Sequence, residues 1–283
     1  MGNSSSTRNL RNGSQPDTVI LEDDVGAAAS HAHHAAFATE LRTNMQRLII
    51  YAQSTDASLQ REVAERLANE AVHADRRRLI IELDGLSLLL PLMRSTDSEI
   101  QRLAAHSLAN LSVEDANQVE IVRRGALEPL VALTRSPVQA VARQAAKALA
   151  NLAVHAGNKR AIAAAGAFAQ LIELTQPGHS VQVMVEAVAA LANLSVDDEN
   201  ELAIGRDLGG VRVLVATARD ARDDELLCQC ARALRNLSVH RDNQALLREH
   251  GGLELLQSLR ASPIDRVRQQ VAVAMANLEK GGR

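Results

Sequence analysis

Six asparagine side chains recur at an almost constant interval along this chain. A carboxamide has one acceptor oxygen and two N–H donors, so it can bind both the C=O and the N–H of an extended main chain. At roughly 1 kcal/mol net for each hydrogen bond, a row of such groups predicts binding of a peptide backbone whatever its side chains. The asparagines are Asn69, Asn110, Asn151, Asn193, Asn236 and Asn277, separated by 41, 41, 42, 43 and 41 residues.

Side chains four and seven positions before each asparagine are expected to share its face, because an α-helix turns by about 100° per residue. These positions differ from one interval to the next, which predicts that they select the side chains of a partner. Lys147 and Arg232 indicate acidic contacts in the middle of the row, whereas Glu65 indicates a basic contact at its start. The predicted binding residues beside the asparagines are Glu65, His106, Gln144, Lys147, Gln229 and Arg232.

The same asparagines have a second interpretation. Each carboxamide would only tie its helix to the next interval or cap a neighbouring turn, because Asn side chains often bond to nearby backbone groups. The two roles are compatible in part, and the sequence leaves both open.

Residue types that carry catalysis or bind metals do not form a recognisable site. His31, His33 and His34 lie in an alanine-rich stretch without a fourth ligand, so solvated side chains are expected there. Cys228 and Cys230 form neither a CxxC pair nor a disulfide framework. The sequence contains no phosphate-binding glycine loop, HExxH or G-x-S-x-G motif. We therefore expect no enzyme activity, no metal site and no cofactor.

The amino terminus reads MGNSSS, which matches the pattern for N-myristoylation with Gly2 as the acceptor after removal of Met1. An unmodified Gly-Ser tail is the alternative. A single myristoyl chain binds membranes only weakly, and the basic residues nearby are limited to Arg8 and Arg11. We therefore expect a reversible tether to a membrane or organelle surface. Residues 1–36 are rich in Ser, Asn, Gly and Asp and are expected to form a disordered tail.

Two further ladders run in phase with the asparagine row and predict the elements that position it. Each interval is predicted to hold a short helix, a second helix after a glycine corner, and a long third helix that ends in a phrase such as LANLSV. The glycine gives the φ freedom that a tight corner requires, and the second set of asparagines is expected to cap the short helices. The glycines are Gly85, Gly125, Gly166, Gly209 and Gly251, and the second asparagines are Asn117, Asn158, Asn200 and Asn243.

Composition limits the class of protein. The chain has 283 residues, of which 46% are hydrophobic but only 1% aromatic, so the core must be aliphatic. The net charge of −3 argues against a protein that neutralises nucleic-acid phosphates. The sequence has no apolar run long enough to cross a bilayer and no secretory signal. With its two cysteines, these features indicate a reducing, cytoplasmic compartment.

The phrase GALEPLV that opens a second helix, the long third helix closing on ALANL, and the period together resemble armadillo repeats. The resemblance implies an all-α fold, a right-handed superhelix (α-solenoid) of about six repeats whose third helices line a concave groove. The repeat domain is expected over 37–283, after the tail over 1–36, and its first repeat lacks an opening helix. The expected repeats are about 37–73, 74–114, 115–155, 156–197, 198–240 and 241–280.

With its amino terminus, the chain is similar to acylated armadillo-only adaptors, such as those of fungal vacuolar inheritance and of secretory-organelle anchoring in apicomplexan parasites. Those adaptors usually carry cysteines beside the glycine, where this chain has serines. The resemblance implies a non-enzymatic scaffold, cytoplasmic or peripheral on a membrane if Gly2 is acylated. Its expected partners are extended protein segments bound in the groove, with no nucleic acid and no small-molecule substrate.

Alternative functions remain within the same fold. One is a soluble cytoskeletal or ciliary armadillo protein, and another is an accessory subunit of an enzyme complex such as a ubiquitin ligase. A nuclear cargo receptor is not expected, because importin-α-like proteins place a Trp one turn before the groove Asn. The residues at those positions here are Glu65, His106, Lys147, Ala189, Arg232 and Val273.

Overall fold

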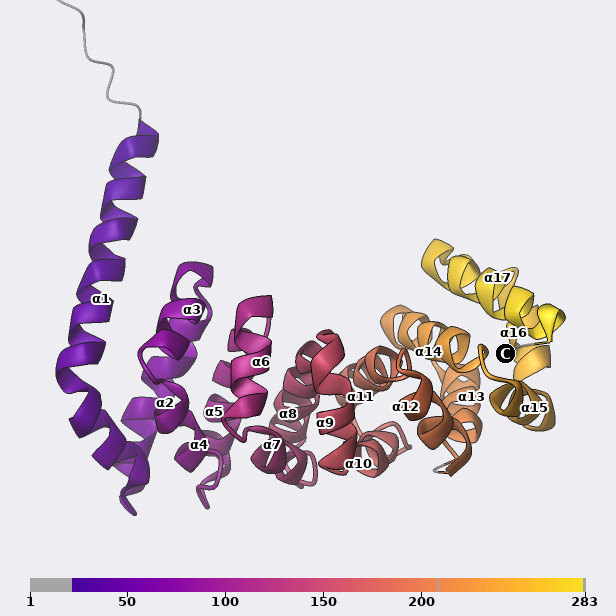
Figure 1. Ribbon diagram of the computed structural model, residues 1–283, viewed down its shortest axis with the longest axis horizontal. Helices are drawn as coiled ribbons and strands as arrows, with labels where there is room; N and C mark the ends of the chain where they lie inside the picture. The colour runs from indigo at the N-terminus through magenta and orange to yellow at the C-terminus, as the bar shows by residue number, and fades with distance from the viewer. Residues whose placement is uncertain (1–21, 208, 282–283) are drawn as a thin grey trace, which may run out of the picture.

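The computed structural model describes residues 22–207 and 209–281. These residues form seventeen α-helices, with no β-strand among them. The helices are stacked one after another along a single long axis, from α1 at one end to α17 at the other (Figure 1). This arrangement confirms the predicted all-α solenoid.

Five units of three helices follow a first unit that consists of α1 (Glu22–Gln53) and α2 (Ala57–Ala71). The first helices of these units are α3 (Ala74–Glu82), α6 (Asp115–Arg123), α9 (Lys159–Ala164), α12 (Asp198–Leu202) and α15 (Arg241–Glu249). The second helices are α4 (Leu86–Leu92), α7 (Leu127–Leu133), α10 (Ala167–Leu174), α13 (Gly210–Asp220) and α16 (Gly252–Leu259). The third helices are α5 (Ser98–Leu111), α8 (Gln139–Leu152), α11 (Val181–Leu194), α14 (Asp224–Leu237) and α17 (Asp265–Lys280).

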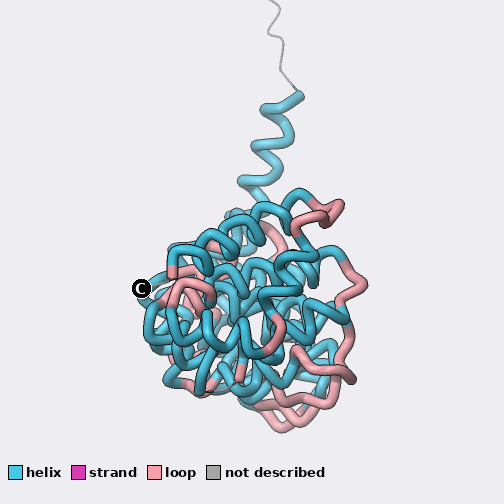
Figure 2. The backbone as a smooth tube through the Cα atoms, turned by 90° about the vertical axis from the view of Figure 1, so that its right-hand side faces the viewer, coloured by secondary structure: helices cyan, strands magenta, loops and turns pink. Residues whose placement is uncertain are grey.

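The core is aliphatic and continuous from unit to unit. Each third helix packs against the third helix before and after it, so that α2, α5, α8, α11, α14 and α17 form one row. Leu149 and Leu152 of α8 are fully buried, as are the small Ala145 and Ala148, which let neighbouring helices approach closely. Viewed end-on, the helices lie behind one another and many of the loops run along the edges of the stack (Figure 2).

The amino-terminal helix α1 is a departure from the prediction. It begins at Glu22 and therefore includes residues 22–36, which we expected to be disordered. The stretch contains many alanines, and Ala has the highest helix propensity of the common residues. Residues 1–21, with the predicted acylation site Gly2, lie outside the described residues. None of the described helices has both the length and the apolar character needed to cross a membrane.

The predicted glycine corners are present with one exception. Gly125, Gly166, Gly209 and Gly251 have positive φ angles between 65° and 84°. Gly85 has a φ of −58°, and its neighbour Asp84 takes the left-handed conformation instead, with φ 62°. Gly85 is required for another reason, because a Cβ atom there would collide with the side chain and the C=O of Ile80.

The second set of asparagines joins units and does not cap the first helices, which corrects the prediction. Asn158 lies at the N-cap position of α9 but makes no capping hydrogen bond. Its Nδ2 donates to Leu152 O and Gln118 O, both at 3.1 Å. The end of a third helix has C=O groups without helical partners, and these buried amides satisfy some of them. The equivalent bonds run from Asn117 to Leu111 O and Arg77 O, from Asn200 to Leu194 O, and from Asn243 to Glu201 O.

The residue after each of these asparagines reinforces the junction. Lys159 Nζ donates to Ala153 O at 2.5 Å and to Asn193 O at 2.6 Å, so it joins the ends of α8 and α11. Gln244 Nε2 makes the same type of link, to Ser238 O and Asn277 O. A basic group suits this place because the carboxyl end of a helix carries partial negative charge.

Candidate functional site

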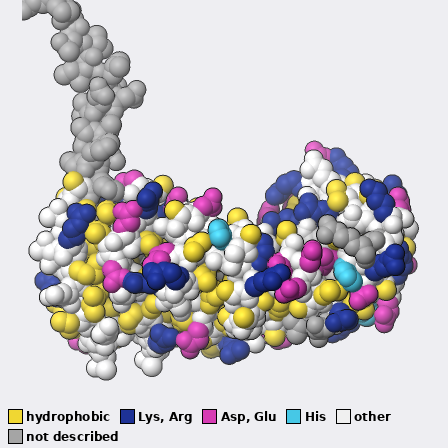
Figure 3. Space-filling view, in the orientation of Figure 1, with side chains coloured by type: hydrophobic (Ala, Val, Ile, Leu, Met, Phe, Trp, Pro, Cys, Tyr) yellow, Lys and Arg dark blue, Asp and Glu magenta, His cyan; other side chains and the backbone are white. Residues whose placement is uncertain are grey.

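The six predicted asparagines lie on the third helices and therefore follow one row of the solenoid. We call the surface formed by these asparagines and by the residues four and seven positions before them the Asn face. Asn69 is exposed and Asn236 is only 8% exposed, while the other four are half-buried. The upper edge of the molecule is hollowed between the amino-terminal units and the raised carboxyl-terminal end, and Lys and Arg side chains gather on the wall of the hollow (Figure 3).

In the middle of the row, each carboxamide ties its helix to the preceding unit. Asn151 Nδ2 donates to Ala109 O at 2.9 Å. The same bond recurs from Asn193 to Ala150 O at 2.8 Å and from Asn236 to Ala192 O at 2.7 Å. This is the joining role that the sequence left open as an alternative. Asn151 and Asn193 use one of their two N–H groups in this way, and their Oδ1 atoms make no hydrogen bond to other described residues.

The ends of the row differ. Asn277 Nδ2 donates to Ser238 Oγ of the preceding unit at 3.0 Å. Asn69 is exposed on α2. A cavity of about 370 Å³ on the same helix is lined by residues that include Glu62 and Glu65. Both carboxylates are exposed, so a basic contact at the start of the row stays a prediction.

His106 lies at the centre of a hydrogen-bonded chain on the Asn face. Its Nδ1 is 3.3 Å from Gln144 Oε1, and its Nε2 is 3.2 Å from Asn110 Nδ2. Because Asn110 Nδ2 can only donate, Nε2 is the acceptor and Nδ1 carries the proton. Burial lowers the pKa of His106, and the positive charges of Lys147, Arg102 and Arg143 lower it further, against the bond to Gln144. The surroundings therefore favour the neutral form of the ring.

Four cations of the Asn face and its border have no carboxylate partner within the described part of the chain. They are Arg143, Lys147, Arg232 and Arg235. Many other Arg side chains are paired, as in the contacts of Arg102 with Glu99 and of Arg266 with Glu225. Burial lowers the pKa of Arg232, as does the neighbouring Arg235. Burial also raises the pKa of Glu186, the carboxyl group that Lys147 and Arg143 face. The middle of the Asn face is therefore positively charged and only partly solvated.

Gln229, another predicted binding residue, is engaged within its own helix. Its Nε2 donates to Glu225 Oε1 at 2.6 Å, while Arg266 Nη2 binds the second carboxylate oxygen at 2.9 Å. Both oxygens of Glu225 are therefore engaged by side chains other than the two arginines of α14. Gln229 thus acts on the charge of the surface through Glu225.

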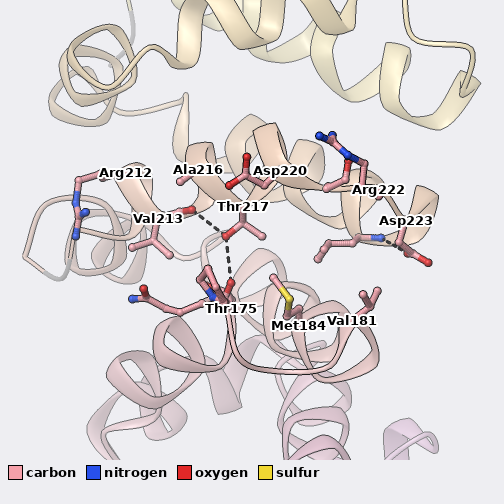
Figure 4. Close-up of a pocket in the computed structure, with 14 residues that line it drawn as sticks. Thr175, Val181, Met184, Arg212, Val213, Ala216, Thr217, Asp220, Arg222 and Asp223 are labelled. Carbon is pink, nitrogen blue, oxygen red and sulfur yellow. Dashed lines mark hydrogen bonds between the residues drawn. The ribbon is translucent and has the colours of Figure 1, made fainter.

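A cavity of about 410 Å³ between the fourth and fifth units was not predicted from the sequence. Val181 and Met184 of α11 face Val213 and Thr217 of α13 across it (Figure 4). The loop before α11 is bonded to the preceding unit, because Ser180 N donates to Gln139 Oε1 at 3.0 Å. The turn at Gln176-Pro177-Gly178 is the one feature of the sequence that could have indicated this cavity. Met184 and Glu186 are two positions apart on α11, so this cavity lies off the Asn face.

Among the described residues, the two cysteines and the His, Asp and Glu side chains form no reactive or metal-binding cluster. Cys228 and Cys230 are buried and free, and burial raises the pKa of Cys230 to about 12. A thiol with so high a pKa is a poor nucleophile. The described residues contain no cluster of His, Cys, Asp and Glu that could hold a metal ion.

Comparison with known proteins gives a consistent picture. The profile of the Armadillo/beta-catenin-like repeat matches residues 73–113, 115–154 and 197–239. An engineered protein solved by a structural genomics consortium is 35% identical, with a TM-score of 0.78 over 84% of this chain and 98% of that protein. A computationally designed armadillo repeat protein for modular peptide recognition is 24% identical, with a TM-score of 0.76 over 82% of this chain and 98% of its own. No curated protein matches the chain.

A further designed armadillo repeat protein was solved in complex with the peptide (KR)4. It is 24% identical to this chain, with a TM-score of 0.74 over 82% of this chain and 98% of its own. At 24% identity, the similarity of this chain to the two designed armadillo proteins shows a shared fold and nothing more.

Proposed function

This chain belongs to the armadillo-repeat family, and we propose that it is a non-enzymatic scaffold that binds an extended segment of a partner protein along its Asn face. Armadillo arrays of the same fold include designed proteins made for peptide recognition. The observation that carries the proposal is the row of carboxamides on successive third helices. Asn151 and Asn193 each keep one N–H and one oxygen for a partner after they have joined neighbouring units.

We propose further that the segment is acidic where it crosses the middle of the Asn face. Arg143, Lys147, Arg232 and Arg235 have no carboxylate partner in the described structure. Glu186 lies close enough to Lys147 and Arg143 for their charges to interact, as Glu225 does to Arg232. Partly buried cations without partners favour a ligand that brings carboxylates, because a charged hydrogen bond is about twice as strong as a neutral one. Positive charge also speeds the encounter with an acidic segment.

Fluorescence anisotropy with labelled peptides tests this proposal. We expect a short peptide of alternating Glu and Ser to bind, and the double variant Asn151→Ala with Asn193→Ala to bind it roughly 30-fold more weakly. That factor corresponds to about 1 kcal/mol for each of the two carboxamides removed. Asn117→Ala is the matched control, since it breaks a bond between units away from the Asn face. Wild-type affinity in the double variant would rule the carboxamides out as binding groups.

We also propose that an acyl chain on Gly2 tethers the scaffold reversibly to a membrane or organelle surface from the cytoplasm. The support is the sequence MGNSSS, and the residues concerned lie outside the described part. Mass spectrometry of the amino terminus should find a myristoyl group, and Gly2→Ala should move the protein from the membrane to the soluble fraction of cells. An unchanged distribution would remove the tether and leave the binding surface unaffected.

A further inference from the structure

The fifth unit differs from the others at the residue that precedes its asparagine. In this unit the phrase is LRNLSV, with Arg235 before Asn236, whereas the second and fourth units read LANLSV. The corresponding residues of the other units are Ala68, Ala109, Ala150, Ala192 and Ala276. The chain thus carries an internal comparison for the effect of this arginine.

Arg235 occupies the acceptor of the neighbouring carboxamide. Its Nε and Nη2 lie 3.1 and 2.8 Å from Asn236 Oδ1. Asn236 Nδ2 donates to Ala192 O at 2.7 Å. With its oxygen bonded to the guanidinium and only 8% of its surface exposed, Asn236 does not offer a partner the acceptor that Asn151 and Asn193 offer.

The guanidinium groups of α14 lack an anionic partner. Arg232 Nη2 donates to Ala189 O at 3.2 Å, and its buried Nε makes no hydrogen bond. Glu225 is the acidic residue on the same face of α14, but Gln229 and Arg266 hold its two oxygens. Arg235 is therefore bonded to a neutral oxygen beside a second cation, an arrangement that a carboxylate would improve.

We propose that Arg235 makes binding at the fifth unit depend on a carboxylate of the partner. An Asp or Glu side chain draws the guanidinium away from Asn236, because a bidentate charged pair is stronger than a bond to a neutral amide. Asn236 Oδ1 then becomes available to an N–H of the partner's main chain. The inference rests on the proposed function and adds to it a residue that determines which segments can bind.

Two matched peptides and one substitution test the inference. The peptides alternate Glu with Ser or Gln with Ser, and both are acetylated and amidated, so that no terminal charge competes. We expect wild-type protein to bind the Glu peptide at least about tenfold more tightly. Arg235→Ala gives the fifth unit the LANLSV phrase of the second and fourth units. This variant should bind the Glu peptide more weakly, and the Gln peptide a few-fold more tightly, than wild type does.

The gain for the neutral peptide is the decisive result, because loss of a purely structural contact would not produce it. Adding Asn236→Ala to Arg235→Ala should abolish that gain. Arg212→Ala, an exposed arginine of α13 off the Asn face, controls for the change in net charge, and should leave the ratio of the two affinities as in wild type. A Gln peptide with a free carboxyl terminus, which has a terminal carboxylate but no side-chain one, separates the effects of the two groups.

Two negative results have different meanings. If Arg235→Ala leaves the preference for the Glu peptide unchanged while that peptide still binds, Arg235 does not control the fifth unit, although the proposed scaffold stands. If wild-type protein binds neither peptide, the proposed function and the inference both fall.

Discussion

A single carboxamide can join two units and still bind a partner, because it has three hydrogen-bonding positions. Asn151 uses one of them for Ala109 O. The sequence predicted the residues of the Asn face from helical spacing alone, but it did not decide between joining and binding. That choice depends on how closely successive third helices approach, which is a property of packing between units.

The contact between Arg235 and Asn236 could not be predicted from helical spacing either. Its position next to Asn236 predicts a direction about 100° away on the helix. The long side chain nevertheless reaches back to the carboxamide. Spacing rules place Cβ atoms, whereas the ends of Arg and Lys side chains follow the local charges, and these were visible only in the structure.

The neutral state of His106 predicts a pH effect on stability. Its pKa is lowered in the folded protein, by burial and then by Lys147, Arg102 and Arg143, whereas the unfolded chain has an ordinary value of about 6.5. As pH falls through about 6.5, the unfolded state therefore takes up the proton first, and the free energy of unfolding decreases. Urea titrations measure the change. Between about pH 7.5 and pH 5.5, the free energy of unfolding should fall more for the wild-type protein than for His106→Gln.

The Gln side chain is a suitable control because it can still contact Asn110 and Gln144 without titrating in this range. All other histidines are common to the two proteins, so their contributions cancel in the comparison. An equal loss of stability in both proteins would show that His106 is not held neutral by its surroundings.

At the scale of the element, the fifth unit absorbs one extra residue without losing its place in the stack. Nine residues separate Asn200 from Gly209, whereas eight separate Asn158 from Gly166. The sequence shows the extra residue, but it does not predict how the helices accommodate it. After α12 the chain widens into a π-helical turn, η2 (Ala203–Asp207), which packs against α13 and α15. Such turns take up single inserted residues.

The close approach of η2 to α15 predicts a sensitive glycine. A Cβ atom on Gly205 would collide with the carboxamide of Asn243, which is fully buried and bonded to Glu201 O at 3.1 Å. We expect Gly205→Ala to lower the free energy of unfolding by about 2 kcal/mol, because neither group can move without breaking that bond. Urea denaturation followed by circular dichroism measures the change.

Gly157→Ala is the matched comparison. Gly157 lies in the turn η1 (Ala156–Asn158) of the fourth unit, where it is exposed and a Cβ atom would lie 3.2 Å from the ring of His155. We expect a change below about 1 kcal/mol there. If the two substitutions have equal effects, the junction between the fifth and sixth units is looser than the structure indicates.

At the scale of the whole molecule, the repeat period predicted the solenoid but not its amino-terminal end. The sequence of α1 does not follow the repeat period. We therefore grouped its alanine-rich start with the polar residues before it and predicted a disordered tail. It packs against α2 and α4, in the place where later units have a first and a second helix. A solenoid needs such a cap, because each unit contacts only its neighbours and the end unit would otherwise leave an apolar face in water.

This arrangement predicts a local effect of weakening α1. Leu41 and Leu48 are 2% and 3% exposed, whereas Ile50 on the same helix is 66% exposed. Leu41→Ala with Leu48→Ala should cost several kcal/mol at the amino-terminal end, at roughly 2 to 5 kcal/mol for each buried leucine. Ile50→Ala should change almost nothing. Hydrogen exchange followed by mass spectrometry should show faster exchange in α1 to α5 of the double variant, with α14 to α17 protected as in wild type. Faster exchange along the entire chain would mean that the six units unfold as one, and that coupling between units reaches further than nearest neighbours.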